Sequence, residues 1–312
     1  MYITKSKISI IGTGMVGSSI AYALMISGLT SRLVLVDIDE KRAQGEAMDL
    51  SHSASFIKPI KITAGDYADC KGSQIVIIAA GANQKPGETR LELTNRNVEV
   101  LNSIIKPLSK HCPDSIVLLV SNPVDILTYV THKSGYFKNG RVIGSGTVLD
   151  TSRFRYLIGQ HCQVDPRSVH AYVLGEHGDS EVLTWSSASI GGMKLLDFCR
   201  LAPGANENWK KDIDYKVRKA AYEIITRKGS TYYAIGMATK RIVEAILRNE
   251  KSVLTVSAMI NNAYGISDVC LSLPTIVGSR GIIRTFEPKL STEEITELQR
   301  SADTLKKYLK NL

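Results

Sequence analysis

The stretch that decides the fold runs from Ile8 to Asp37 and reads ISIIGTGMVGSSIAYALMISGLTSRLVLVD. Two apolar runs, at 8–11 and 33–36, flank a glycine-rich turn and a segment whose apolar residues have helical spacing. Strand, turn, helix and strand in this order form a βαβ unit, for which about 30 residues is the usual size. The stretch therefore predicts the first crossover of a parallel sheet.

Three glycines and one acid give this unit a predicted ligand. Gly12 permits the tight turn, Gly14 lets the backbone approach a pyrophosphate, and Gly17 lets the helix lie close to the strand. Asp37 ends the second strand twenty residues after Gly17, where a carboxylate can bind the ribose hydroxyls of adenosine and would repel a 2′-phosphate. A bare glycine turn would mean little, but with both strands and the acid in place the pattern predicts NAD as cofactor.

A signal peptide or a membrane span is the alternative interpretation of this end of the chain. Residues 8–28 carry no charge and follow Lys5 and Lys7. Nine of these twenty-one residues are Gly, Ser or Thr, so no dense apolar segment exists, and cleavage at Ala23 would remove the first strand. We therefore expect no leader and no membrane partner.

The composition is that of a globular enzyme. The chain has 312 residues, of which 44% are hydrophobic and 22% charged, enough for two domains that share a large core. The net charge of +9 could indicate a nucleic-acid partner, but the basic residues are dispersed and no basic run with interleaved aromatic residues occurs. A solvated surface with sites for small anions is the preferred interpretation, and no nucleic acid is expected.

The five cysteines indicate neither disulfides nor a metal site. They are widely scattered, odd in number and lack any C-x-x-C pair. A reducing, cytoplasmic location is therefore expected, with no metal.

The order of apolar and helical segments predicts the fold class, which is α/β. Six strand-like runs alternate with helical patterns in the first half (7–11, 33–36, 60–63, 75–80, 115–120 and 141–143). This alternation predicts a Rossmann doubly wound parallel sheet, which we assign to an NAD-binding domain over residues 1–146.

The pattern changes in the second half, where a mixed α+β substrate-binding domain is predicted over residues 147–312. Strand-like and helical segments no longer alternate regularly there (strands 168–174, 252–260 and 268–277; helices 207–226 and 231–248). The chain closes on a capping-box pattern at Ser291 that begins an amphipathic helix.

Four polar stretches follow predicted strands or open a predicted helix. The loop at 80–90 and Asn122 both leave the carboxyl ends of parallel strands, where open α/β sheets bind ligands. Asp150 and Arg153 open a helix, and Arg153 offers a planar fork for a carboxylate. His177 lies among glycines after a strand, which exposes it to a ligand, although a surface histidine in a turn would look the same.

These stretches, with the motifs NQKPGETR at 83–90, DTSR at 150–153 and GEHGD at 175–179, resemble the L-lactate dehydrogenases of the lactate/malate dehydrogenase family. The resemblance runs nearly from end to end of the chain. It implies an NAD-dependent enzyme that interconverts pyruvate and L-lactate and assembles as a homotetramer.

The resemblance also implies roles in catalysis. Asp150 would pair with His177, which would protonate the keto oxygen and remove the proton in reverse. Arg153 would bind the substrate carboxylate, and Arg90 would polarise the carbonyl from a closing loop. Asn122 would hydrogen-bond the same oxygen region and help to seat the nicotinamide.

Further ligand contacts are implied at other positions. Thr231 would line the methyl side of the substrate. Besides the glycines of the turn, the cofactor would contact a set of residues spread over the first half (Val16, Asp37, Arg42, Tyr67, Gly81, Ala82, Asn122 and Ser145). Tyr67 and Ser145 have little support of their own and could equally serve packing.

Gln84 bears on the choice of substrate. Malate dehydrogenases of this family carry an arginine at the corresponding loop position, where it pairs with the second carboxylate of oxaloacetate. A neutral amide offers no such charge, and an unpaired carboxylate buried under a closed loop would be costly. Pyruvate and L-lactate are therefore expected, unless Gln84 points to solvent.

Arg155 and His170 suggest regulation. The bacterial lactate dehydrogenases that fructose 1,6-bisphosphate activates carry an arginine and a histidine at these positions, and this chain resembles that type most. Unrelated surface contacts would be the alternative for both residues.

Two other functions remain open. The first is a malate or other 2-hydroxy-acid dehydrogenase, which substrate assays around Gln84 would distinguish. The second is a dinucleotide-binding structural or sensor protein without turnover, which would need none of the implied catalytic residues as a set.

Overall fold

We describe the fold from a computed structural model, which covers residues 6–82, 87, 89–199 and 208–312. The first half alternates strands and helices as predicted. Its elements are β1 (Lys7–Ile11), α1 (Met15–Ser27), β2 (Arg32–Val36), α2 (Glu40–His52), β3 (Lys61–Ala64), β4 (Ile75–Ile78), α3 (Arg90–His111), β5 (Ile116–Leu119), α4 (Val124–Lys133) and β6 (Val142–Gly144).

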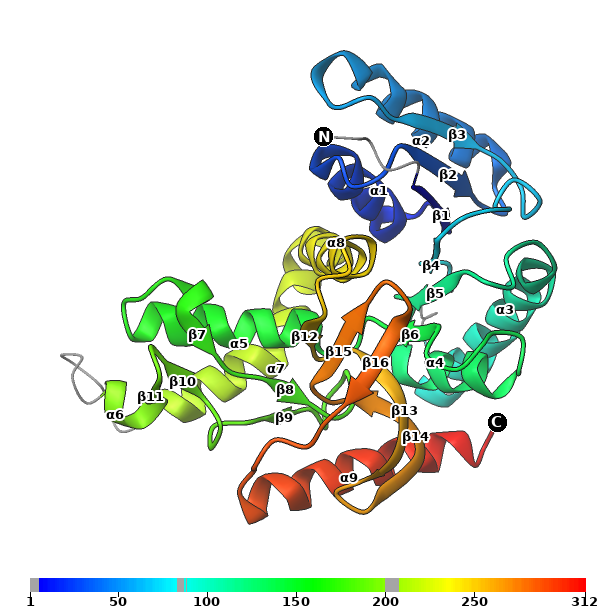
Figure 1. Cartoon of the computed structure of the whole chain (residues 1–312). Helices are drawn as coiled ribbons and strands as arrows, with labels where there is room; N and C mark the ends of the chain where they lie inside the picture. Colours follow the sequence, from blue (N-terminus) through cyan, green and yellow to red (C-terminus); the bar gives the residue numbers. More distant parts are fainter. Residues whose placement is uncertain (1–5, 83–86, 88, 200–207) are drawn as a thin grey trace.

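These six strands form a parallel sheet in the order β3-β2-β1-β4-β5-β6. The chain starts in the middle and winds outward in both directions, so the carboxyl ends of β1 and β4 meet where the direction changes. Open sheets bind ligands at this switch point. Helices α1 and α2 cover one face and α3 and α4 the other (Figure 1). The predicted Rossmann sheet is therefore confirmed.

The second half is an α/β arrangement of short strands and longer helices. It contains α5 (Val148–His161), β7 (Val169–His170), β8 (Val173–Leu174), β9 (Val182–Leu183), β10 (Ser189–Ile190), β11 (Met193–Lys194), α6 (Leu195–Cys199), α7 (Trp209–Lys228), α8 (Tyr233–Leu247), β12 (Ser252–Leu254), β13 (Ser257–Ala263), β14 (Ile266–Ser272), β15 (Thr275–Gly278), β16 (Gly281–Thr285) and α9 (Thr292–Leu309).

Each long strand predicted here is divided in the structure, because each changes its partner halfway. In the segment 168–174, β7 pairs with β10 while β8 pairs with β9. In 252–260, β12 pairs with β15 while β13 pairs with β14 and β6. In 268–277, β14 pairs with β13 while β15 pairs with β12 and β16. Apolar spacing does not record such a change, and the two-residue strands give no period to detect.

Two strands of the second half extend the large sheet. β13 pairs antiparallel with β6 through Ser257 and Gly144, and β14 follows it at the edge. Helix α8 packs beside α1, with Gly236 so close to Ser19 that a Cβ there would lie 3.1 Å from the carbonyl oxygen. The predicted domain boundary at 146/147 stays a prediction, since sheet and core both continue across it.

The last helix begins as its sequence predicts. The Ser291 side chain accepts a hydrogen bond from the Glu294 amide, and the Glu294 carboxylate accepts one from the Ser291 amide, which completes the capping box. Leu298 and Leu305 are buried on its inner face. α9 runs along β14 (Figure 1), and its Ser301 reaches the loop that carries His177.

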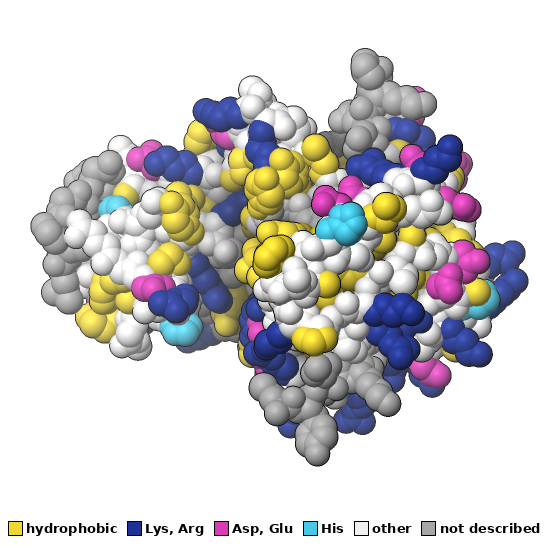
Figure 2. All heavy atoms as spheres, turned by 90° about the horizontal axis from the view of Figure 1, so that it is seen from above, with side chains coloured by type: hydrophobic (Ala, Val, Ile, Leu, Met, Phe, Trp, Pro, Cys, Tyr) yellow, Lys and Arg dark blue, Asp and Glu magenta, His cyan; other side chains and the backbone are white. Residues whose placement is uncertain are grey.

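The described residues also bear on possible partners of the protein. No helix among them is long and apolar enough to cross a membrane. In that part of the chain no cluster of histidine, cysteine and acidic residues has the arrangement of a metal site. The five cysteines are buried as free thiols. On the face seen in Figure 2, lysine and arginine are interspersed with acidic side chains rather than gathered into one patch.

Candidate active site

The glycine turn has the geometry that a dinucleotide requires. Gly12 has a positive φ of 94°, and a Cβ there would lie 2.5 Å from the Ala80 nitrogen. At Gly17 a Cβ would lie 1.9 Å from the Gly12 oxygen, so strand and helix can approach only without a side chain. A Cβ at Gly14 would meet nothing within 4 Å, and no side chain caps α1 there. The first amides of α1 can therefore receive a phosphate.

Asp37 is an ionised acceptor beside this turn. Its carboxylate accepts hydrogen bonds from the amide of Thr13 at 2.6 Å, from the Thr13 hydroxyl at 2.9 Å and from the Asp39 amide at 3.1 Å. Burial alone would raise the pKa of Asp37, but these bonds and the nearby charge of Arg42 lower it from the usual value. Arg42 Nε donates to the Thr13 oxygen at 3.1 Å. The predicted ribose acceptor and Arg42 thus lie next to the turn.

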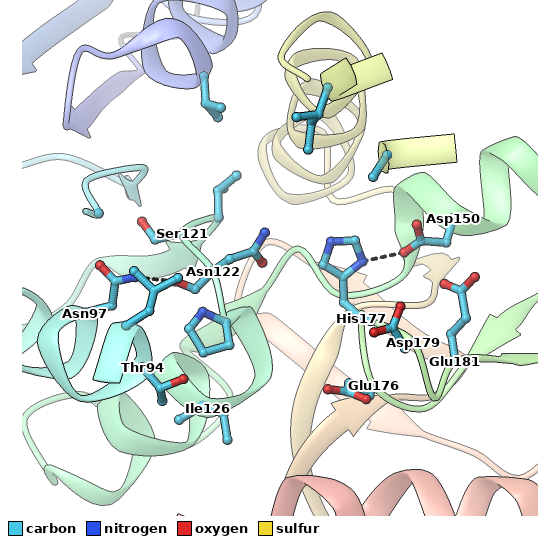
Figure 3. Close-up of a pocket in the computed structure, with 18 of the residues that line it drawn as sticks. Thr94, Asn97, Ser121, Asn122, Ile126, Asp150, Glu176, His177, Asp179 and Glu181 are labelled. Carbon is cyan, nitrogen blue, oxygen red and sulfur yellow. Dashed lines mark hydrogen bonds and ion pairs between the residues drawn. The ribbon is translucent and has the colours of Figure 1, made fainter. Parts of the chain in front are cut away.

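A cavity of about 580 Å³ opens beside the switch point of the sheet. The carboxyl ends of β4 and β5, the first turn of α5, the loop after β8 and one face of α7 line it, and Figure 3 shows its polar residues. Of the residues predicted from the sequence, seven contribute to its walls: Val16, Gly81, Ala82, Asn122, Asp150, Arg153 and His177.

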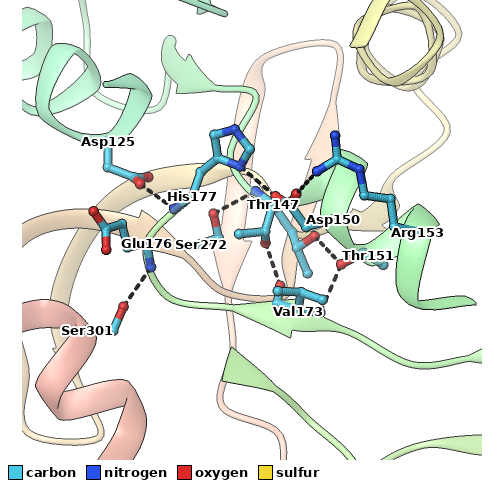
Figure 4. A network of polar contacts seen from close by, with 11 residues as sticks. Asp125, Thr147, Asp150, Thr151, Arg153, Val173, Glu176, His177, Ser272 and Ser301 are labelled. Carbon is cyan, nitrogen blue, oxygen red and sulfur yellow. Dashed lines mark hydrogen bonds and ion pairs between the residues drawn. The ribbon is translucent and has the colours of Figure 1, made fainter. Parts of the chain in front are cut away.

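The catalytic pair predicted from the sequence is in contact in the structure. His177 Nδ1 lies 2.5 Å from Asp150 Oδ2, and Arg153 Nη1 lies 2.7 Å from Asp150 Oδ1 (Figure 4). The Asp150 side chain is almost fully buried, whereas a quarter of the His177 side chain is exposed toward the cavity. The far edge of the imidazole faces Asn122 across the cavity (Figure 3).

This contact keeps a proton on the histidine. Burial lowers the pKa of His177, but the charge and hydrogen bond of Asp150, with smaller contributions from Asp125 and Glu181, raise it to about 9. Burial would raise the pKa of Asp150, yet His177 and Arg153 lower it. At neutral pH the pair is therefore an imidazolium held by a carboxylate.

The backbone around His177 is fixed from three sides. Its amide donates to Asp125 Oδ2 at 2.7 Å, and the Glu176 amide donates to Ser301 Oγ at 2.8 Å. Gly175 exchanges two backbone hydrogen bonds with Ser272, both of 2.9 Å. Asp125 is fully buried, and that burial raises its pKa to about 6. These contacts come from α4, α9 and β14, so the loop depends on distant parts of the chain.

Several supporting residues were not predicted. Asn97 accepts the Ala82 amide at 2.7 Å and donates to the Asn122 oxygen at 3.0 Å, which joins two cavity loops. Asp125 lies three residues after Asn122, in the stretch SNPVD at 121–125. Its closeness to Asn122 in the sequence could have indicated that it belongs to the site. Glu181 and Arg218 line the cavity as well, and Arg218 comes from a helix whose sequence gave no hint of a site.

Other residues predicted for the site do not line the cavity or are not among the residues that the structure describes. Gln84 is outside the described residues, and only the backbone of Arg90, which begins α3, is described. Thr231 is half-buried between α7 and α8 and is not among the described residues that line this cavity. Tyr67 packs against the core of the first half, and Ser145 is buried.

The two residues predicted for an effector lie outside the cavity. Arg155 Nε donates to the Ala171 oxygen at 2.9 Å, and its guanidinium lies 5.2 Å from the ring centre of Tyr172. His170, the residue before Ala171, is exposed. Arg155 and His170 therefore belong to adjoining segments, α5 and β7.

Two models of known protein families match this chain. The model of the lactate/malate dehydrogenase NAD-binding domain matches residues 6–144, and the model of the lactate/malate dehydrogenase alpha/beta C-terminal domain matches residues 147–312. The chain therefore belongs to the lactate/malate dehydrogenase family, and its cofactor is NAD.

Individual relatives narrow the grouping. The L-lactate dehydrogenase of Acetivibrio thermocellus is 54% identical over 98% of this chain and 97% of its own length. L-lactate dehydrogenase 1 of Clostridium acetobutylicum is 52% identical over 98% of both chains. The crystal structure of a minor L-lactate dehydrogenase from Enterococcus mundtii, in a ligand-bound form, matches with a TM-score of 0.96 and 43% identity over 99% of both chains. Within its family, the chain thus groups with the L-lactate dehydrogenases.

Proposed function

We propose that this protein reduces pyruvate to L-lactate and catalyses the reverse reaction, with His177 as the acid and base. The observation that carries the proposal is the contact of His177 with buried Asp150, in a cavity that the carboxyl ends of β4 and β5 also line. Bound NADH supplies the hydride, and the residues of the cavity bind, orient and protonate the substrate.

His177 has the properties that the proton transfer needs. Its raised pKa, of about 9, keeps it protonated at neutral pH, so it can give a proton to the keto oxygen of pyruvate. Asp150 holds Nδ1, which leaves Nε2 to act on the substrate. In reverse, neutral His177 accepts the proton of the lactate hydroxyl. Pyruvate reduction should therefore decline as the pH rises through about 9, where the imidazolium is lost.

Arg153 and Asn122 would orient the substrate. In the present structure Arg153 Nη1 is bound to Asp150, and the rest of its guanidinium fork can bind the carboxylate of pyruvate. Asn122 lies opposite His177 and can bind the same oxygen that receives the proton. Arg90, at the start of α3, would stabilise the developing negative charge at that oxygen.

The substrate proposal rests on Gln84. Its neutral amide would leave a second substrate carboxylate without a charge partner, which favours pyruvate over oxaloacetate. A malate or other 2-hydroxy-acid dehydrogenase is the alternative activity.

Regulation and assembly complete the proposal. Arg155 and His170 would bind a phosphate group of fructose 1,6-bisphosphate between neighbouring subunits of a cytoplasmic homotetramer. Support comes from the adjoining positions of Arg155 and His170 and from the presence of an arginine and a histidine at these positions in the regulated enzymes that the chain resembles.

One assay separates the alternatives. NADH oxidation is followed by the loss of its absorbance, with pyruvate, oxaloacetate and a branched 2-keto acid tested in parallel. The proposal predicts the highest kcat/KM for pyruvate. A preference for oxaloacetate would indicate a malate dehydrogenase, and the absence of turnover with all three would indicate a binding protein.

A further inference from the structure

Glu181 is a buried acid in the wall of the cavity that the proposed mechanism does not use. It lies in the loop between the His177 segment and β9, and only 4% of it is exposed. Among the described residues, its Oε1 has no hydrogen-bond partner. A carboxyl group is seldom buried in this way, because the loss of hydration is costly. A buried carboxyl group in the cavity wall therefore points to a role in the site.

Its surroundings are those of the catalytic pair. Glu181 lies on the Asp150 side of the cavity (Figure 3), and the charges that act on it come from three elements: Asp150 and Arg153 of α5, His177 of the loop, and Arg218 of α7. His177 in turn experiences the charges of Asp150, Asp125 and Glu181.

Arg218 fixes Glu181 without forming an ion pair with its carboxyl group. Arg218 Nη1 donates to the backbone oxygen of Glu181 at 2.5 Å and to that of Asp179 at 3.2 Å, while Nε donates to Asp214 Oδ1 at 2.7 Å. The guanidinium therefore holds the loop against α7 and shares its charge with Asp214. The charge of the Glu181 carboxyl group can therefore still act on the other residues that line the cavity.

We propose that Glu181 is a positioning residue that acts through His177, and that its carboxylate charge retains the proton on the imidazole when the surrounding solution becomes alkaline. The proposal rests on the acid role of His177 proposed above. It adds to Asp150 and Asp125 a further acid whose charge favours the protonated imidazole, the form that reduction of the keto group needs.

The pKa values of Glu181 and His177 determine the pH range in which Glu181 would act on the imidazole. Burial, and next to it the charge of Asp150, raise the pKa of Glu181 to about 8, whereas His177 titrates at about 9. Glu181 is therefore mostly neutral at neutral pH and becomes charged just before His177 would lose its proton. Because the new negative charge stabilises the imidazolium, the two groups titrate as a coupled set.

The test replaces the carboxyl group by a neutral amide of the same shape, in Glu181→Gln. Histidine labelled with ¹³C at Cε1 reports the titration of His177 in the protein without NADH, and the His177→Asn variant assigns its signal. We expect the midpoint of His177 to fall by about one pH unit, as for the loss of one neighbouring charge. The alkaline limb of kcat/KM for pyruvate should move by the same amount, with little change near pH 6.5.

Two further variants separate charge from packing. Glu181→Asp keeps the charge and should place the midpoint between those of the native protein and Glu181→Gln. Glu223→Gln removes an exposed acid of α7, which pairs with Arg227, and should leave the His177 titration unchanged.

Two results would overturn the proposal. One is a His177 midpoint that is the same in Glu181→Gln as in the native protein. The other is a rate that falls equally at every pH, which would assign Glu181 to packing alone. If His177→Asn retained full turnover, the proposed acid role would fail, while the NMR midpoint would still decide whether Glu181 acts on the imidazole.

Discussion

The glycine turn before α1 and the loop that carries His177 contribute to the same functional region, but they are held in place in different ways. The turn depends on residues close together in the sequence, because Gly12, Gly17 and Asp37 all belong to one βαβ unit. The His177 loop depends on Asp125, Ser272 and Ser301, which come from three distant elements.

This difference determines which substitutions the glycine turn and the His177 loop each tolerate. In the turn, the space around the backbone limits which side chains fit. A methyl group added at Gly12 or Gly17 would collide with backbone atoms. In the loop, buried polar contacts are the limit, so that a change of one charge alters the proton on His177 without a steric conflict. The predictions below test the two kinds of dependence, beginning with the turn.

The turn should break most completely at Gly17. In Gly17→Ala the new Cβ would lie 1.9 Å from the Gly12 oxygen, so we expect about 3 kcal/mol or more of lost unfolding free energy and no measurable NADH binding. Gly14→Ala is the matched control, because its Cβ meets no atom within 4 Å. It should unfold at the native denaturant concentration yet bind NADH less tightly. Equal stability of both variants would refute the steric account.

Specificity should change at Gln84, on the substrate side. Gln84→Arg adds a cation where a second carboxylate would lie, and one or two charge-assisted hydrogen bonds should shift the ratio of kcat/KM for oxaloacetate over pyruvate by about 10²-fold. The two substrates are compared in both proteins, with Gln84→Asn as the neutral control. If the ratio did not move, Gln84 would not face the ligand.

Cofactor choice should respond to Asp37. The native protein should prefer NADH to NADPH, because the ionised carboxylate repels a 2′-phosphate. Asp37→Ser removes that charge and should narrow the preference by about tenfold, a value typical of one exposed charge contact. Fluorescence titration of both cofactors measures the effect, and equal affinities in the native protein would remove Asp37 from the ribose site.

The last of these predictions concerns regulation. Fructose 1,6-bisphosphate should lower the apparent KM for pyruvate by an amount equivalent to about 1–3 kcal/mol, a usual size for coupling between sites. The double variant Arg155→Gln with His170→Gln should lose this response and keep its activity at saturating pyruvate. A native saturation curve that the effector does not move would return both residues to ordinary surface contacts.

The same contrast explains how much the sequence could predict. The Rossmann sheet and the glycine turn follow from local spacing, so the strands agree with the prediction, and Gly12, which was assigned to the tight turn, has a positive φ there. The contact of His177 with Asp150 was expected only through the resemblance of their motifs to a family, since 27 residues separate them. Glu181 and Arg218 were missed, because an acid or an arginine at a given position carries no sign of burial until the elements pack. Strands that change partner, such as those at 168–174, escaped for the same reason.

The central claim is that the two regions are separable, so that the proton donor can be removed without harm to the cofactor site. The most direct measurement takes His177→Asn and determines, on one preparation, the Kd for NADH by fluorescence and kcat for pyruvate in the steady state. The account predicts an unchanged Kd and a loss of turnover of about 10²–10⁴-fold, the usual contribution of general acid catalysis. Native turnover in His177→Asn would contradict it.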